Sequence, residues 1–287
     1  MSVRVFAPAK INLTLKVAAP RPDGRHPLAS AVAFADVGDW LEARQADGLT
    51  LAVSGPFAGD LQDEADNLVL RAARALAARF GVEAKAALKL EKNLPVASGI
   101  GGGSSDAAAA LKALNALWGL KASEADLMAV AAPLGADIPV CVPARAAFMT
   151  GAGEICAPLS IPAMAAVLVN PLRPAPTGAV YRAFDSMGLG AAISETPPVW
   201  PDLAAAIAGM KALGNDLTAP AVSLVPEIAD ALEALRADAR ALYTGLSGSG
   251  ATCYAIAASP TEAEALCVEI KTRRPSWWCA ATRLAVG

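Results

Sequence analysis

The chain has 287 residues, of which 55% are hydrophobic and 5% aromatic, and its formal net charge is −3. No stretch of about 18 consecutive apolar residues occurs, so no membrane-spanning helix is predicted, and the N-terminus lacks the basic flank and apolar core of a signal peptide. The acidic balance argues against a general nucleic-acid-binding protein. Five scattered cysteines without a CxxC pair argue against a disulfide framework or a zinc site, and they fit a reducing cytoplasm.

The first half of the chain alternates predicted strands and helices. Residues 3–17 are predicted to form a strand broken at Pro8, and the composition of residues 21–26 (RPDGRH) indicates a turn. Further strands are predicted over 49–55 and 86–94. Between them lies a predicted helix, in which Leu68, Ala72, Leu76 and Phe80 recur every four residues, Asp66 or Asn67 is the cap and Gly81 is the stop.

After residue 95 the chain continues with a glycine-rich turn, a helix that ends near Gly119, and a helix opened by a capping box of Ser123 and Asp126. The character changes near residue 155, where we place the boundary between two domains, 1–155 and 156–287. In the second domain we expect strands at 163–170 and 252–258, a loop at 185–198, and helices at 226–240 and 260–274. The last helix is expected to open with Thr261 and Glu264 at capping-box spacing.

The turn at residues 99–105 (GIGGGSS) leads into an alanine-rich helix, an arrangement suited to binding an anion. First-turn N–H groups of a helix lack internal partners, the helix dipole adds positive charge, and glycines allow close approach of the backbone. Phosphate binding is therefore favoured over a purely structural turn. A Walker A loop does not fit, because no Lys follows the glycines. A dinucleotide-binding fingerprint fits poorly, because Ser104 stands at its third glycine.

Three segments in this order resemble the signatures of the GHMP kinases, the superfamily of galactose, homoserine, mevalonate and phosphomevalonate kinases. They are PAKINLTLKV near the start, PVASGIGGGSSDAAAAL at 95–111 and LSGSGATCYAI at 246–256. The resemblance covers nearly the whole chain. It implies an α+β fold, with an N-terminal α/β domain like domain 2 of ribosomal protein S5 and a C-terminal ferredoxin-like domain.

Within the superfamily, the segments RPDGRH, LGADIPV and PTGAVY are most similar to members that phosphorylate a cytidine diphosphate-linked methylerythritol. The resemblance implies an ATP-dependent transfer to the 2-hydroxyl of this small molecule, a step in the non-mevalonate isoprenoid pathway. It implies no separate metal site, since Mg²⁺ would arrive with the nucleotide. A monomer or a weak homodimer is expected, without nucleic-acid or membrane partners.

The same resemblance assigns catalytic roles to Asp137 and Lys10. Asp137 would accept the proton of the acceptor hydroxyl, and Lys10 would keep this carboxylate ionised and stabilise the developing oxyanion. Residue patterns alone leave other roles open. Asp137 stands where an Asp often caps a short helix, the role that its position alone favours, and Lys10 could be a solvated lysine of a strand.

The remaining site residues also follow from the resemblance. His26 would read the cytosine edge, Tyr181 would stack on the ring, and Arg25 would replace an aromatic residue common in the family. Taken alone, a single His is more often a surface or structural residue, and Tyr181 could be core packing. The acceptor is predicted to contact Asn12, Arg25, His26, Thr177, Tyr181 and Gly248. The nucleotide is predicted to contact Asn67, Lys92, Pro95, Val96, Ala97, Ser98, Gly99, Ile100, Gly101, Gly102, Gly103, Ser104, Ser105 and Asp106.

Two further departures from the family pattern and three alternative functions remain at this point. Pro27 after His26 is unexpected and should stiffen the turn, and Ala97 with Ser98 stands where the family has small residues, often including Gly. A GHMP kinase for another alcohol, such as homoserine, mevalonate or a sugar, would share most of these motifs. A nucleotide-binding regulator without catalysis would lack the need for Lys10 and Asp137, and a Rossmann-type oxidoreductase is disfavoured by the order of elements.

Overall fold

The structure is a computed structural model that describes residues 2–61 and 67–284. Contacts within the chain divide it into two compact units, which are described separately. Unit 1 comprises residues 1–9, 38–96 and 101–144, and unit 2 comprises residues 10–37, 97–100 and 145–287. The strands β1 (Ser2–Asn12) and β3 (Leu28–Arg44) each contribute residues to both units. The domain division predicted at residue 155 stays a prediction.

In unit 1, the end of β3 pairs with β5 (Ala86–Glu91) in antiparallel fashion, and β5 pairs with β4 (Leu49–Ser54) in parallel. The helix α1 (Leu68–Phe80) connects β4 to β5. Asn67 caps α1 by accepting a hydrogen bond from the Val69 N–H, and Gly81 ends it in a left-handed conformation. The predicted cap and stop are therefore confirmed, while the alternative cap, Asp66, lies outside the described residues.

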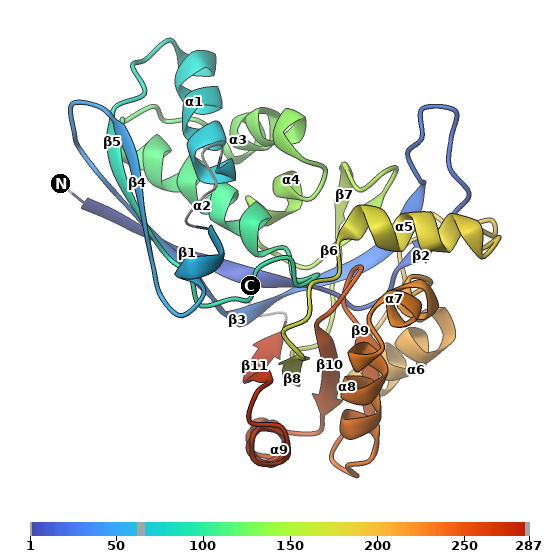
Figure 1. Ribbon diagram of the computed structural model, residues 1–287. Helices are drawn as coiled ribbons and strands as arrows, with labels where there is room; N and C mark the ends of the chain where they lie inside the picture. The colour runs from blue at the N-terminus through green and yellow to red at the C-terminus, as the bar shows by residue number, and fades with distance from the viewer. Residues whose placement is uncertain (1, 62–66, 285–287) are drawn as a thin grey trace. The chain divides into compact units, whose positions relative to one another are not determined.

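The helices of unit 1 pack against one another beside the β4–β5 pair (Figure 1). Beyond α1 they are the 3₁₀ turn η1 (Ala58–Leu61), α2 (Gly102–Leu117), α3 (Glu124–Ala131), the 3₁₀ turn η2 (Ala132–Leu134) and α4 (Ile138–Cys141). The capping box of Ser123 and Asp126 at α3 is present as predicted. Along α2, Leu111 and Leu114 are fully buried, so α2 forms the centre of this helical layer.

The predicted strand break at Pro8 is wrong, because β1 continues through this residue to Asn12. β1 pairs with β3, and proline is tolerated in a strand where its missing N–H faces away from the ladder. The partner strand accommodates it with Gly38: a Cβ at Gly38 would lie 2.2 Å from the Ala7 carbonyl oxygen and 2.8 Å from the Cα of Pro8.

Unit 2 contains an antiparallel sheet whose strands pair in the order β11–β8–β10–β9. Its strands are β8 (Met164–Asn170), β9 (Tyr243–Leu246), β10 (Cys253–Ala257) and β11 (Trp278–Leu284). The helices α8 (Glu227–Arg236) and α9 (Pro260–Arg273) share one buried core with β8 and β10. Strands in the spatial order fourth, first, third, second with helices on one face form the ferredoxin-like arrangement, as predicted.

The remaining elements of unit 2 lie outside this four-stranded sheet and outside α8 and α9. They are β2 (Lys16–Val17), β6 (Ala147–Thr150), β7 (Ile155–Pro158), α5 (Thr177–Ser186), α6 (Leu203–Leu213) and α7 (Thr218–Leu224). Helix α9 begins at the cap Ser259, whose hydroxyl accepts from the Glu262 N–H, so the predicted opening at Thr261 is wrong by two residues. Among the described residues, no helix combines the length and apolarity needed to cross a bilayer.

Candidate active site

The first turn of α2 supplies the unit 1 part of the glycine-rich turn. Gly101 precedes the helix in a left-handed conformation (φ +63°), and no side chain caps the helix. Ser105 does not point its hydroxyl to this end, because it donates to the Pro8 carbonyl oxygen at 2.7 Å. A Cβ added at the exposed Gly103 would meet no protein atom within 4 Å. The end of α2 is therefore bare backbone beside open space, as an anion cradle requires.

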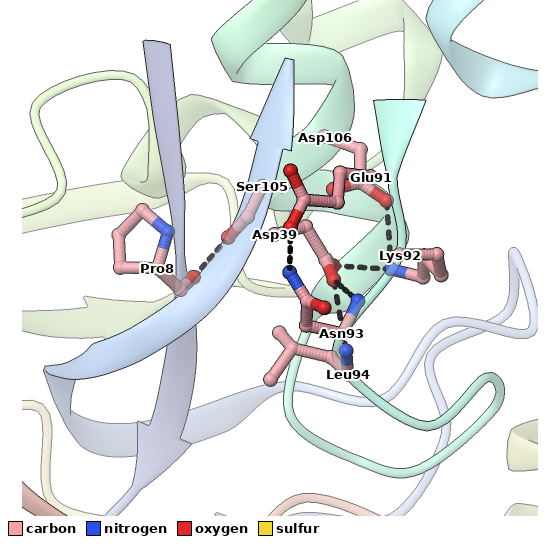
Figure 2. Close-up of polar contacts among 8 residues, drawn as sticks. All are labelled: Pro8, Asp39, Glu91, Lys92, Asn93, Leu94, Ser105 and Asp106. Carbon is pink, nitrogen blue, oxygen red and sulfur yellow. Dashed lines mark hydrogen bonds and ion pairs between the residues drawn. The ribbon is translucent and has the colours of Figure 1, made fainter. Parts of the chain in front are cut away.

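Beneath this turn lies a buried cluster of three charged side chains, Asp39, Lys92 and Asp106 (Figure 2). The Lys92 ammonium donates to Asp39 Oδ2 at 2.5 Å and to Asp106 Oδ2 at 2.8 Å. Asp39 Oδ1 accepts the backbone N–H groups of Asn93 and Leu94, at 2.5 and 2.8 Å. The cluster therefore joins β3, the end of β5 and α2.

The surroundings raise the pKa values of two members of this cluster, Lys92 and Asp106. Burial acts to lower the pKa of Lys92, but Asp106 and Asp39 outweigh burial and raise it. For Asp106, burial dominates: together with the charge of Asp39 it outweighs the opposing Lys92 and raises the pKa of Asp106 to about 7. Lys92 thus stays charged at neutral pH, whereas Asp106 titrates near it.

Residues 97–100 of the turn belong to unit 2, where they pack on the segment 247–252. The Ser247 hydroxyl donates to the Gly99 carbonyl at 2.9 Å, and the Thr252 N–H donates to the Ser98 carbonyl at 3.0 Å. A Cβ at Gly99 would lie 2.5 Å from the Ser247 carbonyl, and one at Gly248 would lie 2.9 Å from the Gly99 carbonyl. The second and third sequence motifs therefore meet through two glycines that tolerate no side chain.

Ala97 adopts a positive φ of 49°, a conformation that costs an alanine free energy, whereas Ser98 is not among the positive-φ residues. The turn can therefore hold Ser98 without strain, and the strain falls on Ala97. Pro95 and Val96 precede this point in unit 1, and Ile100 is fully buried in unit 2. Ser104 is partly exposed in the first turn of α2.

Lys10 and Asn12 lie side by side on the end of β1 that belongs to unit 2. Lys10 is 2% exposed, so the alternative of a solvated strand lysine is wrong, and its N–H donates to the Ile100 carbonyl at 2.9 Å. The Asn12 side chain donates to the Ser30 hydroxyl at 2.8 Å, and its N–H donates to Ser247 Oγ at 3.1 Å. These contacts hold the first motif next to the second motif at Ile100 and the third motif at Ser247.

Asp137 lies in unit 1 immediately before α4, and it is exposed. It occupies the N-cap position, but its carboxylate makes no capping hydrogen bond. The capping hydrogen bond that position alone favoured is therefore absent. Because Lys10 belongs to unit 2, the convergence of these two side chains stays a prediction.

His26, Tyr181 and Thr177 come together within unit 2. The His26 ring lies 4.9 Å from the Tyr181 ring, and its Nε2 lies 2.8 Å from Asp185 Oδ1. The Thr177 hydroxyl lies 3.0 Å from the Ser249 hydroxyl, next to Gly248. Arg25 is exposed in the tight turn that follows Arg21, which confirms the predicted turn. The geometry thus brings together four of the six predicted acceptor contacts in two pairs, His26 with Tyr181 and Thr177 with Gly248.

Asn67 and Lys92 have contacts other than those predicted for them. Asn67 caps α1, and Lys92 is held by two carboxylates. Their proximity to a nucleoside stays a prediction. Sequence reasoning missed Asp39, Asp185 and Ser247, which hold Lys92, His26 and Asn12. A detectable sign exists only for Asp39, an acidic residue within the apolar run 28–43.

Comparison with known proteins matches both halves of the chain to one family. Residues 67–144 match the GHMP kinases N terminal domain, and residues 199–274 match GHMP kinases C terminal. A relative from Parvibaculum lavamentivorans named 4-diphosphocytidyl-2-C-methyl-D-erythritol kinase is 50% identical over 277 residues, 95% of this chain and 94% of its own length. The chain belongs to the GHMP kinase family.

Other GHMP kinases match this chain over its full length. A relative of the same name from Caulobacter vibrioides is 46% identical over 291 aligned residues, covering 99% of this chain and 100% of its own. The crystal structure of a 4-(cytidine 5'-diphospho)-2C-methyl-D-erythritol kinase superposes with a TM-score of 0.80 at 32% identity, covering 99% and 100% of the two chains. The predicted family, kinase activity and α+β fold class are confirmed, and the Rossmann alternative is wrong.

Proposed function

We propose that this GHMP kinase transfers the γ-phosphoryl group of ATP to the 2-hydroxyl of 4-diphosphocytidyl-2-C-methyl-D-erythritol, within the non-mevalonate isoprenoid pathway. The observation that carries the proposal is the 50% identity, over nearly the whole chain, to a kinase named for this acceptor. The bare end of α2 beside Gly103 supports ATP as the donor, because backbone N–H groups at a helix N-terminus fit phosphate oxygens.

In this proposal the protein supplies positions and charges, which is what phosphoryl transfer demands. The first-turn N–H groups of α2 hold the phosphates, and Mg²⁺ arrives with the nucleotide to neutralise phosphate charge. Asp137, exposed immediately before α4, accepts the proton of the acceptor hydroxyl. Lys10, buried on β1, stabilises the oxygen as negative charge develops on it.

The acceptor is recognised through its cytidine group. A His ring donates or accepts hydrogen bonds at a base edge, and an aromatic ring stacks on the base face. His26 and Tyr181 meet ring to ring at 4.9 Å, so one base could contact both. Arg25, exposed in the preceding turn, offers a flat cation for stacking or for the diphosphate.

An ADP-release assay with a panel of acceptors tests the proposal. The cytidine-linked acceptor should give the highest kcat/KM, ahead of homoserine, mevalonate and galactose. Asp137→Asn should lower kcat by about 10²- to 10⁴-fold, as expected for loss of a general base. Asp47→Asn, which removes an exposed carboxylate of the same unit, is the matched control. A higher kcat/KM for another alcohol would refute the acceptor, and unchanged turnover in Asp137→Asn would refute the base.

We also propose the finer points that the family leaves open: a cytoplasmic location, a division into domains at residue 155, and a monomer or weak homodimer. None of the five cysteines, all of which lie within the described residues, forms a disulfide, which suits a reducing compartment. Sedimentation at micromolar concentration distinguishes a monomer from a dimer.

A further inference from the structure

One oxygen of the buried cluster under α2 has no hydrogen-bond partner. Among the buried side-chain nitrogen and oxygen atoms of the described residues, Asp106 Oδ1 alone lacks one. Asp106 Oδ2 and both oxygens of Asp39 are engaged with Lys92, Asn93 and Leu94. A buried carboxylate oxygen without a donor is costly. Protonation of Asp106 reduces this cost, because the neutral carboxyl group can donate a hydrogen bond to the carboxylate of Asp39.

Counting charges leads to the same conclusion. With both carboxyl groups ionised, the cluster holds two negative charges against the single positive charge of Lys92, all at 3% exposure or less. With one proton on Asp106, the cluster is neutral. The cluster also touches the glycine-rich turn directly: a Cβ at Gly102 would lie 2.9 Å from Lys92 Nζ and 3.7 Å from Asp39 Oδ2. The net charge of the cluster therefore changes the electrostatic potential at the first turn of α2.

We propose that Asp106 is a positioning residue that couples phosphate binding to proton uptake. When a nucleotide's phosphates bind at the first turn of α2, the Asp39–Lys92–Asp106 cluster shifts toward its neutral form, in which it carries one proton. The inference rests on the proposed function, which places the phosphates there. A negative charge behind the turn repels them, and a neutral cluster does not, so the anion favours the protonated form. Asp39 stays the hydrogen-bond acceptor for two backbone N–H groups and fixes the turn.

The groups acting most strongly on Asp106 come from two neighbouring elements. Lys92 reaches it from the end of β5, and Asp39 from β3. The helices α1, α3 and α4 also pack on α2. α4 has no charged side chain, and those of α1 and α3 are at least partly exposed: Arg71, Arg74, Arg79, Glu124 and Asp126.

Calorimetric titration of the full-length enzyme with ATP, in excess Mg²⁺ at pH 6.0 and 8.5, tests the coupling without an acceptor. A unit charge on the order of 10 Å from the phosphates, in a medium between protein surface and water, changes affinity by roughly 4- to 15-fold. The wild-type Kd should therefore rise by about this factor at the higher pH. Asp106→Asn retains an acceptor for Lys92 and carries no charge. The Kd of this variant for ATP should therefore differ by less than twofold between the two pH values.

Two controls separate this effect from others. Adenosine, which has no phosphates, should bind with the same Kd at both pH values, and Asp47→Asn should behave as wild type. In buffers of different ionisation enthalpy near pH 8, the wild type should take up a fraction of a proton on binding ATP, and Asp106→Asn should not. If Asp106 contributed only to stability, the wild type and Asp106→Asn would take up the same number of protons on binding ATP.

The outcomes distinguish this inference from the proposed function. If wild type and Asp106→Asn show the same pH dependence and the same proton uptake, the coupling is refuted while ATP binding stands. If ATP does not bind to the folded wild type at either pH, the proposed function itself fails. Should Asp106→Asn bind more weakly than wild type at both pH values, the neutral form is not the binding form, and the inference is overturned.

Discussion

Two adjacent glycines at the start of α2 allow the phosphate cradle to be tested with the same chemical change made twice. A methyl group at Gly103 would enter open space, whereas one at Gly102 would lie 2.9 Å from Lys92 Nζ and 3.8 Å from the Leu94 Cβ. Gly103→Ala should therefore preserve the fold and stabilise it by about 0.5 kcal/mol, because alanine loses less backbone entropy in a helix. Gly102→Ala should destabilise the protein by about 1–3 kcal/mol through overpacking against the cluster.

Gly103→Ala should weaken ATP binding although it stabilises the fold. If phosphate oxygens occupy the open space, the methyl blocks at least one N–H contact to a charged group. Such a hydrogen bond contributes about 1.5–3 kcal/mol, so the Kd for ATP should rise by roughly 10- to 100-fold. Gly59→Ala, at an exposed glycine in η1 with no atom near the added Cβ, is the matched control and should bind ATP as wild type does.

Denaturant unfolding and calorimetric titration on the same preparations separate the two effects. The decisive result is a Gly103→Ala protein that is as stable as wild type and binds ATP poorly. A Gly103→Ala protein that binds ATP with wild-type affinity would show that the phosphates do not lie at this turn, and the assignment of the cradle would have to be abandoned.

Three further predictions concern single residues. Asp106→Asn should flatten the pH dependence of unfolding between about pH 4 and 7: because the pKa of Asp106 is raised from 3.8 to about 7, the folded state binds more protons there, and stability falls as pH rises, by at most roughly 4 kcal/mol. Ala97→Gly should raise the free energy of unfolding by about 0.5–1 kcal/mol in urea titrations, because it relieves a positive φ; a loss of stability would contradict this. His26→Ala should raise KM for the cytidine acceptor at least tenfold and leave KM for ATP unchanged; equal changes in both would argue against base recognition.

Local patterns predicted the helices of unit 1 well, because their signals lie within a few residues of one another. Asn67, Gly81, Ser123 and Asp126 fix where α1 and α3 begin or end through hydrogen bonds to their own helix. The long strand β3 was missed. Its residues pair with β5, β6 and β11, which are remote in sequence, and its two aspartates interrupt an apolar run that would otherwise indicate a strand.

The same distinction, between local signals and contacts that are remote in sequence, applies to the candidate site residues. The glycine-rich turn could be recognised because its glycines are consecutive and precede a helix, a local pattern with a local cause. Asp39 could not be linked to Lys92, which follows 53 positions later, because only the pairing of β3 with β5 brings them together. His26 and its partner Asp185 are separated by 159 positions, so the sequence predicted a role for the His and no residue to orient it.

The glycines of the turn show how one motif can serve several constraints. A side chain at Gly99 would collide with the Ser247 and Gly250 carbonyls, one at Gly101 would be strained by the φ of +63°, and one at Gly102 would crowd the Lys92 ammonium. Only Gly103 is unconstrained by the protein itself. Three of these four glycines therefore shape the turn, and one leaves it open. A protein that needed only a compact turn could place alanine at 103 and gain helix stability, so the glycine there is best explained by a ligand that needs the space.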